Sequence, residues 1–165
     1  MKSEPTGIAL LIAGLLFAVF LLLKMFRPPA AKTPQWLQAK RTIDEAKRRG
    51  RDKTKDARQR AKAWRDASLA ALEGLNRPGL AASYAFRAER LDPGDIEAVN
   101  LLMLTLRRAE RYRALERFLW RRLASDPLDQ TAAADTFFLT ELLKLYEGPL
   151  RRPEIAAGLR RIAKN

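Results

Sequence analysis

The chain has 165 residues and a formal net charge of +13, and it contains neither cysteine nor histidine. The lack of these two residue types excludes disulfides, zinc sites built on their side chains, thiol nucleophiles and imidazole general bases. The sequence also has no glycine-rich phosphate loop and no nucleophile elbow, so we expect neither enzymatic activity nor a metal or cofactor.

The first apolar segment, residues 7–26, contains no charged residue before Lys24. Twenty helical residues span about 30 Å, which is the thickness of the hydrocarbon core of a bilayer. A cleaved signal peptide is the alternative, but the apolar run is longer than usual for one and no net positive charge precedes it. We therefore expect residues 1–26 to form an uncleaved transmembrane anchor.

The charges beside this anchor predict its orientation. Lys2 and Glu4 before it cancel, whereas Lys24, Arg27 and the basic residues after them make the following segment strongly positive. The positive-inside rule then places the N-terminus outside and the rest of the chain in the cytoplasm. We expect a single-pass protein of the plasma (inner) membrane, and the high content of Ala, Leu and Arg is typical of a bacterial protein.

The positive charge is concentrated in residues 24–65, which we name the basic belt. This segment carries 15 Lys or Arg against four acids, whereas residues 66–165 carry 16 against 14. Residues 27–60 are typical of a Pro-containing spacer followed by a basic juxtamembrane helix, which Gly50 should break or bend. The candidate residues for the membrane interface are Lys24, Arg27, Trp36, Leu37, Lys40 and Arg41.

Several interpretations of the basic belt remain open. It forms a solvated spacer helix, a clamp on anionic lipid headgroups, or a contact with an acidic protein surface. Its densest part, residues 47–62, contains no aromatic residue on which a base could stack. We therefore expect neither nucleic acid nor a small molecule as a partner.

The second part of the chain contains a repeat with a period of 34 residues. Basic helical stretches close on Asp-Pro at Pro93 and again at Pro127, with apolar residues at helical spacing between them. These features resemble tetratricopeptide (TPR) repeats, which are 34-residue helix-turn-helix units closed by a proline. The matching residues are Ala81, Ala88 and Pro93 in the first unit, and Leu102, Leu106, Tyr112, Leu119 and Pro127 in the second.

The resemblance implies an all-α fold in which a short stack of helix pairs follows the anchor and the basic helix. The repeat domain would cover residues 61–165, with units at about 61–95, 96–129 and 130–165. First-turn prolines are expected at Pro78, Pro127 and Pro153, and N-caps at Asp95 and Asp129. The chain departs from the family pattern at Glu110, where glycine is usual, and at Met103, Leu115 and Arg122, where small residues are usual.

The resemblance further implies a groove lined by the first helix of each pair, the surface on which such repeats grip a peptide or helix. The candidate lining residues are Lys62, Arg65, Asn100, Leu104, Arg107, Arg108, Phe138 and Glu141. Two alternatives stay open for members of this set. Arg107 and Arg108 fit a solvated surface equally well, and Leu104 and Phe138 fit the core better than a contact surface.

These expectations lead to two possible functions. In the first, the chain is a non-catalytic, membrane-anchored scaffold or adaptor whose cytoplasmic TPR-like domain binds a partner protein near the membrane. In the second, it is an accessory subunit that stabilises or assembles a larger integral membrane complex. Both functions imply a membrane-associated protein partner, and anionic lipid headgroups are the expected contact of the basic belt.

Overall fold

The computed structural model describes Leu15, Phe17 and residues 34–124 and 132–162. The predicted anchor and the interface candidates Lys24 and Arg27 lie outside these residues, except that Leu15 and Phe17 are helical and exposed. Within the described part of the chain, no helix combines the length and hydropathy needed to span a membrane. The chain divides into two units, residues 1–37 and residues 38–165, and α3 and all later helices belong to the second.

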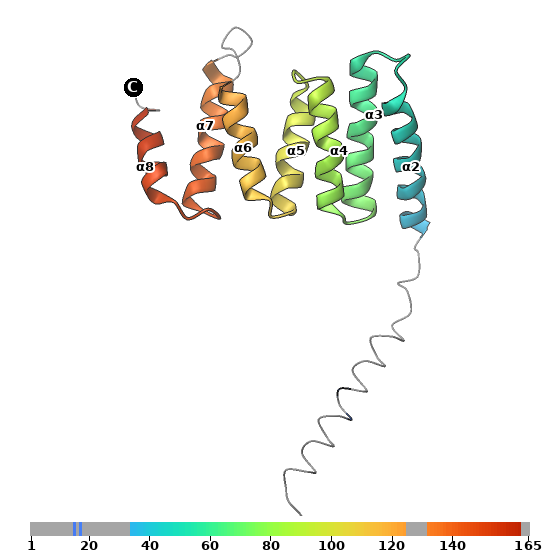
Figure 1. Cartoon of the computed structure of the whole chain (residues 1–165), viewed down its shortest axis with the longest axis horizontal. Helices are drawn as coiled ribbons and strands as arrows, with labels where there is room; N and C mark the ends of the chain where they lie inside the picture. Colours follow the sequence, from blue (N-terminus) through green and yellow to red (C-terminus); the bar gives the residue numbers. More distant parts are fainter. Residues whose placement is uncertain (1–14, 16, 18–33, 125–131, 163–165) are drawn as a thin grey trace, which may run out of the picture. The chain divides into compact units, whose positions relative to one another are not determined.

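The described residues form α-helices and no strand, which confirms the predicted all-α class. The elements are α2 (Pro34–Arg51), α3 (Ala57–Leu69), a π-helical turn η1 (Ala70–Gly74), α4 (Pro78–Leu91), α5 (Ile96–Arg108), α6 (Tyr112–Leu123), α7 (Ala132–Glu147) and α8 (Pro153–Ile162). From α3 to α8, each helix packs on the next one along the chain, and successive helices run in alternating directions (Figure 1). Three hairpins result: α3 with α4, α5 with α6, and α7 with α8.

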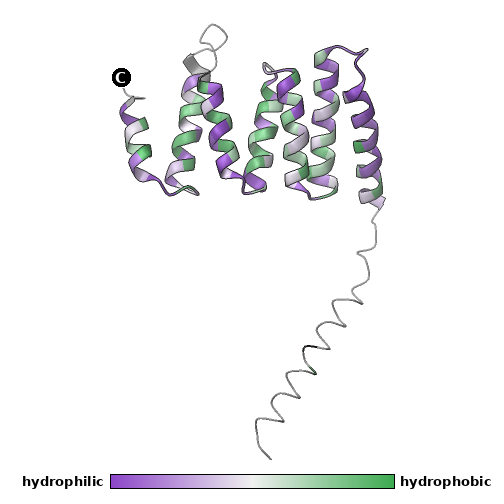
Figure 2. Ribbon diagram, in the orientation of Figure 1, coloured by the Kyte–Doolittle hydropathy of each residue, from purple (hydrophilic) through white to green (hydrophobic). Residues whose placement is uncertain are grey.

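The core runs through this series of helices, and apolar residues dominate α5 and α7, whereas α2 is mostly hydrophilic (Figure 2). Its largest fully buried apolar side chains are Leu102, Leu106, Leu115, Leu119, Leu142 and Tyr146. The basic helix α2 joins the core through a narrow stripe that includes Ile43 and Ala46. Packing of this stripe, rather than helix propensity alone, stabilises a helix as polar as α2.

Several helices begin at the first-turn prolines and N-cap residues that the sequence predicts. Pro78 and Pro153 are the first residues of α4 and α8, as predicted. Asp95 is the N-cap of α5, and its Oδ1 accepts hydrogen bonds from the backbone N–H groups of Glu97 at 3.0 Å and Ala98 at 3.2 Å. The predicted cap Asp129 and the predicted first-turn residue Pro127 lie outside the described residues.

The helical segment of the basic belt is interrupted at the predicted place. Helix α2 ends at Arg51, directly after Gly50, and α3 begins at Ala57 with Asp56 as its N-cap. Gly50 is required here because a Cβ atom on it would lie 2.6 Å from the indole ring of Trp64. Glycine therefore permits a close approach of α2 to α3.

Burial repeats with a period of 34 residues between the first two hairpins. In α3 and η1, Trp64, Ser68 and Leu72 are buried, and so are the residues of α5 that lie 34 positions later, Ala98, Leu102 and Leu106. In the second helices, the same holds for Ala81, Tyr84 and Ala85 and for Leu115, Phe118 and Leu119. The period read from the two prolines is therefore a period of core packing in these two hairpins.

The third hairpin follows at a longer interval. Leu142 and Tyr146 are the buried residues of α7 that correspond to Leu102 and Leu106, 40 residues earlier. The connection from α6 to α7 covers residues 124–131, whereas the connection from α4 to α5 covers only residues 92–95. The longer connection shifts the register of the third hairpin relative to a strict 34-residue repeat.

The turn inside each hairpin contains one residue with a positive φ angle: Asn76, Glu110 and Arg151, with φ of 49°, 55° and 50°. At the second of these turns, the Arg111 N–H donates to the Leu106 carbonyl at 2.9 Å and closes the end of α5. Such left-handed positions favour glycine, and asparagine tolerates them better than other residues do.

The substitution Glu110→Gly is expected to raise the free energy of unfolding by about 1 kcal/mol. The left-handed conformation costs a residue with a Cβ atom about 1–2 kcal/mol, and part of the gain is offset by the freedom of glycine in the unfolded chain. Urea denaturation measures the change, with Asn76→Gly as the matched control, for which a smaller gain is expected. Equal gains at both positions would contradict this explanation.

Candidate functional site

The residues predicted to line a groove lie on α3, α5 and α7, the first helices of the three hairpins. Five of the eight are exposed: Lys62, Asn100, Leu104, Arg107 and Arg108. Leu104 exposes 42% of its surface, so its assignment to the core is wrong. Arg65 is half-buried, and Phe138 and Glu141 are buried.

Phe138 and Glu141 do not line an open surface. They lie 34 residues after Leu104 and Arg107, but the register of α7 is shifted to 40 residues. Phe138 therefore occupies a core position with 5% exposure, and Glu141 is exposed by only 6%. By the shifted register, the exposed residue of α7 that corresponds to Leu104 is Lys144.

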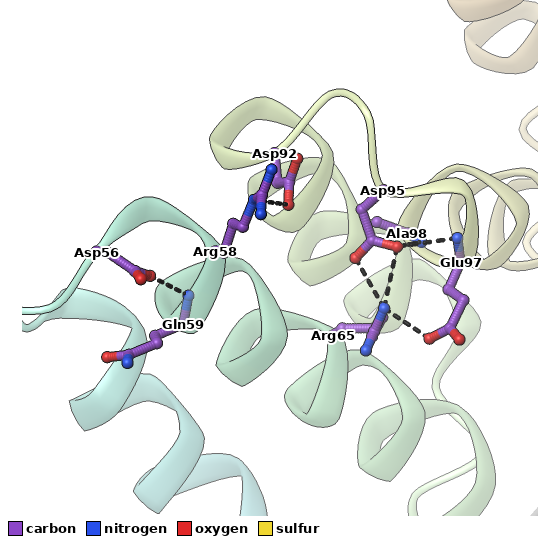
Figure 3. Close-up of polar contacts among 8 residues, drawn as sticks. All are labelled: Asp56, Arg58, Gln59, Arg65, Asp92, Asp95, Glu97 and Ala98. Atoms are coloured by element: carbon purple, nitrogen blue, oxygen red, sulfur yellow. Dashed lines mark hydrogen bonds and ion pairs between the residues drawn. The ribbon is translucent and has the colours of Figure 1, made fainter.

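Arg65 is engaged within the fold (Figure 3). Its Nη1 lies 2.7 Å from Oδ2 of Asp95 and 2.6 Å from Oε2 of Glu97, so the guanidinium joins α3 to the first turn of α5. Arg65 and Asp95 are both largely buried, and each satisfies the charge of the other. This side chain positions the first two hairpins and is not a free donor for a partner.

Glu141 forms a second connection between first helices. Its carboxylate contacts the guanidinium of Arg107 and accepts a hydrogen bond from Nζ of Lys144 at 2.9 Å. A buried carboxylate is stabilised only if such cations compensate its loss of hydration. The predicted pair Arg107 and Glu141 thus comes together as an internal ion pair between α5 and α7.

The exposed residues of α5 form a regular stripe. Ile96, Asn100, Leu104 and Arg108 follow one another at intervals of four, so they lie on one side of the helix. Ile96 exposes 73% of its surface, the largest fraction among the exposed large apolar residues of the described chain. This stripe and the corresponding residues of α3 and α7 together form a surface that we name the first-helix face. The residues from α3 and α7 are Lys62, Asp66, Thr136, Thr140 and Lys144.

Five residues of this face were not predicted from the sequence: Ile96, Asp66, Thr136, Thr140 and Lys144. The four-residue spacing from Leu104 was a signal that could have identified Ile96. No comparable signal existed for the residues of α7, because their register depends on the length of the connection before that helix.

The interface candidates in the described residues lie on the first turns of α2. Trp36 is half-buried, and Leu37, Lys40 and Arg41 are exposed. The spacing from Leu37 to Arg41 places these two residues on the same side of the helix. Leu37, Lys40 and Arg41 therefore lie at the surface of α2.

In the part of the chain that the structure describes, two titratable groups have shifted pKa values, and both shifts have structural causes. Burial raises the pKa of the Tyr146 hydroxyl above its usual value, and this hydroxyl donates to Oε1 of Glu116 at 2.6 Å and accepts from Nε1 of Trp120 at 3.0 Å. The hydrogen bonds from Thr54 lower the pKa of the Asp52 carboxyl. Among the described residues, no group of His, Cys, Asp or Glu is arranged to hold a metal ion.

Comparison with known proteins assigns the chain to no family. No family model matches the sequence, and no significant match is found among curated proteins or solved structures.

Proposed function

We propose that this chain is a non-catalytic, single-pass membrane protein whose TPR-like helix pairs bind a partner protein close to the membrane. The anchor in residues 1–26 holds the helix pairs on the cytoplasmic side of the plasma membrane, with the N-terminus outside. The basic belt supports this placement, because each Lys or Arg near an anionic surface contributes about 1 kcal/mol of attraction.

The first-helix face is the observation that carries the proposal. Ile96 and Leu104 expose large apolar side chains on it, and full burial of one such side chain contributes about 1.5–3 kcal/mol. Asn100 and Arg108 lie between and beside them and offer hydrogen-bond donors to the backbone or a carboxylate of a bound segment. An apolar centre with polar neighbours is the composition expected of a protein-binding surface.

The 34-residue period of burial in the first two hairpins supports the assignment to TPR-like repeats. In such stacks each hairpin packs only on its neighbours, and about three hairpins are needed for stability. The described helices form three, and the contacts between α4 and α5 and between α6 and α7 join them in order. The first helices then share one side of the stack, where a partner segment contacts several of them at once.

Co-purification at rising salt tests this function against the alternative of an accessory subunit. The full chain, tagged at its C-terminus, is purified in mild detergent, and the retained proteins are identified after each salt wash. We expect one partner whose yield falls as salt rises, because Arg108 and the basic belt contribute electrostatic attraction. A fixed set of membrane subunits retained at high salt favours the accessory subunit, and no retained protein at low salt contradicts both functions.

A further inference from the structure

A pocket of about 520 Å³ lies where the end of α2 meets α3 and α4. It is lined by Gly50, Arg51, Lys53, Arg60, Trp64, Arg87, Arg90 and Leu91. Five of these eight residues are cationic and none is acidic. The cations come from three helices and one connection, so the fold brings them together from separate parts of the sequence.

Two residues that line this pocket are tied to a third by hydrogen bonds to the carbonyl oxygen of Gly50. This oxygen accepts hydrogen bonds from Nε1 of Trp64 at 3.1 Å and from Nε of Arg60 at 3.2 Å. The absence of a side chain at Gly50 permits this contact. The end of α2 is thereby held against α3, and the next residues, Arg51 and Lys53, are brought to the pocket.

The pocket cations lack carboxylate partners. Within the described residues, none of the five forms an ion pair with an acid. The guanidinium of Arg87 lies over the ring of Trp64 at 4.7 Å from its centroid, which orients the charge without neutralising it. By contrast, Arg65, Arg107 and Arg121 each pair with a carboxylate elsewhere in the fold.

The acids close to these cations in sequence do not line the pocket, although the charge of Asp52 acts on Arg60 from outside it. Asp52 accepts hydrogen bonds from the N–H and the hydroxyl of Thr54, at 3.0 Å and 2.7 Å. Asp92 lies 3.9 Å from the guanidinium of Arg58 (Figure 3). Neither carboxylate lines the pocket, so a ligand there would meet cationic side chains and no acidic one.

We propose that this pocket binds a multiply charged phosphate, carried either by a lipid headgroup or by a soluble diphosphate. Guanidinium groups bind phosphate oxygens in a bidentate manner. A ligand with several negative charges compensates five cations better than a ligand with a single carboxylate does. The volume falls in the range of small-ligand sites, about 300–1,000 Å³. The site is separate from the first-helix face, so failure of one proposal does not decide the other.

Isothermal titration calorimetry on the full chain in neutral detergent tests the proposal with two probes. One probe is inorganic pyrophosphate, and the other is neutral micelles doped with phosphatidic acid. The pocket variant Arg51→Gln/Arg90→Gln removes two exposed cations and is expected to lose about 100-fold in affinity, because hydrogen bonds to charged groups are strong. The control Arg117→Gln/Arg161→Gln removes the same charge from exposed sites on α6 and α8 and should lose less than about threefold.

Each outcome supports or overturns the site. If pyrophosphate binds and its binding depends on the pocket residues, a soluble phosphate is sufficient as the ligand. If the micelles with phosphatidic acid bind through the pocket and pyrophosphate does not, the ligand is a lipid headgroup. The proposal is overturned if neither probe binds, or if the pocket and control variants lose affinity equally, since the attraction is then diffuse. It is also overturned if a poly-glutamate peptide binds through the pocket while both phosphate probes fail.

Discussion

The substitution Trp64→Ala is expected to lower the free energy of unfolding by about 3–5 kcal/mol, the usual cost of removing a large buried aromatic side chain. Trp64 is almost fully buried and stacks on Tyr84 with a distance of 5.7 Å between ring centroids. Its N–H also donates to the Gly50 carbonyl, so one side chain joins α2 to both α3 and α4. Loss of the ring leaves a cavity at the junction of these three helices.

Urea denaturation followed by circular dichroism measures this loss, and Trp64→Phe provides the matched control. Phenylalanine keeps an apolar ring but lacks the N–H donor, while Arg60 still donates to the Gly50 carbonyl. We therefore expect the phenylalanine variant to lose clearly less stability than the alanine variant. Equal losses would show that the hydrogen bond, and not ring packing, holds this junction. No loss in either variant would contradict the packing of α2 on α3.

The substitution Leu102→Ala is expected to cost about 2–5 kcal/mol, the range observed for leucine truncation in protein cores. Leu102 is fully buried in α5 at the centre of the helix series. Leu104, two residues later on the same helix, is the matched control because it exposes 42% of its surface. For Leu104→Ala the free energy of unfolding should change by no more than about 0.5 kcal/mol.

Thermal or urea unfolding of the two leucine variants decides which face of α5 is buried. If Leu104→Ala destabilises the protein as much as Leu102→Ala does, both leucines are in the core and the first-helix face is not exposed. If the predicted difference is found, Leu104 remains available for contact with a partner. The same variant can then be used in binding experiments without loss of the fold.

Much of the fold could be predicted from the spacing of apolar residues and prolines. The period between Pro93 and Pro127 anticipated the period of burial, because the first two hairpins have the same connection length. Asp95 and Pro78 marked helix starts through local chemistry, since a cap or a first-turn proline depends on few neighbours. Such signals are short-range and are visible in the sequence itself.

The candidate site was less predictable, for two physical reasons. The longer connection before α7 changed the register, so Glu141 is buried instead of lining an open surface, and Phe138 lies in the core, which was the preferred alternative for it. Whether a charged side chain is free to contact a partner or is paired inside the fold also depends on residues far away in the sequence, as for Arg65, which pairs with Asp95. The cationic pocket around Gly50 is a further example, since its residues converge from three helices whose packing no local pattern reveals.

Site-specific photocrosslinking in cells tests the central claim, that the first-helix face binds a partner protein. A photoreactive residue is placed at Leu104 on α5 or, as the control, at Arg117, an exposed residue of α6. We predict an adduct of defined mass from position 104, with the crosslinked protein in the membrane fraction, and none from position 117. An adduct of the same partner from position 117 alone, or no adduct from either position, would contradict the claim.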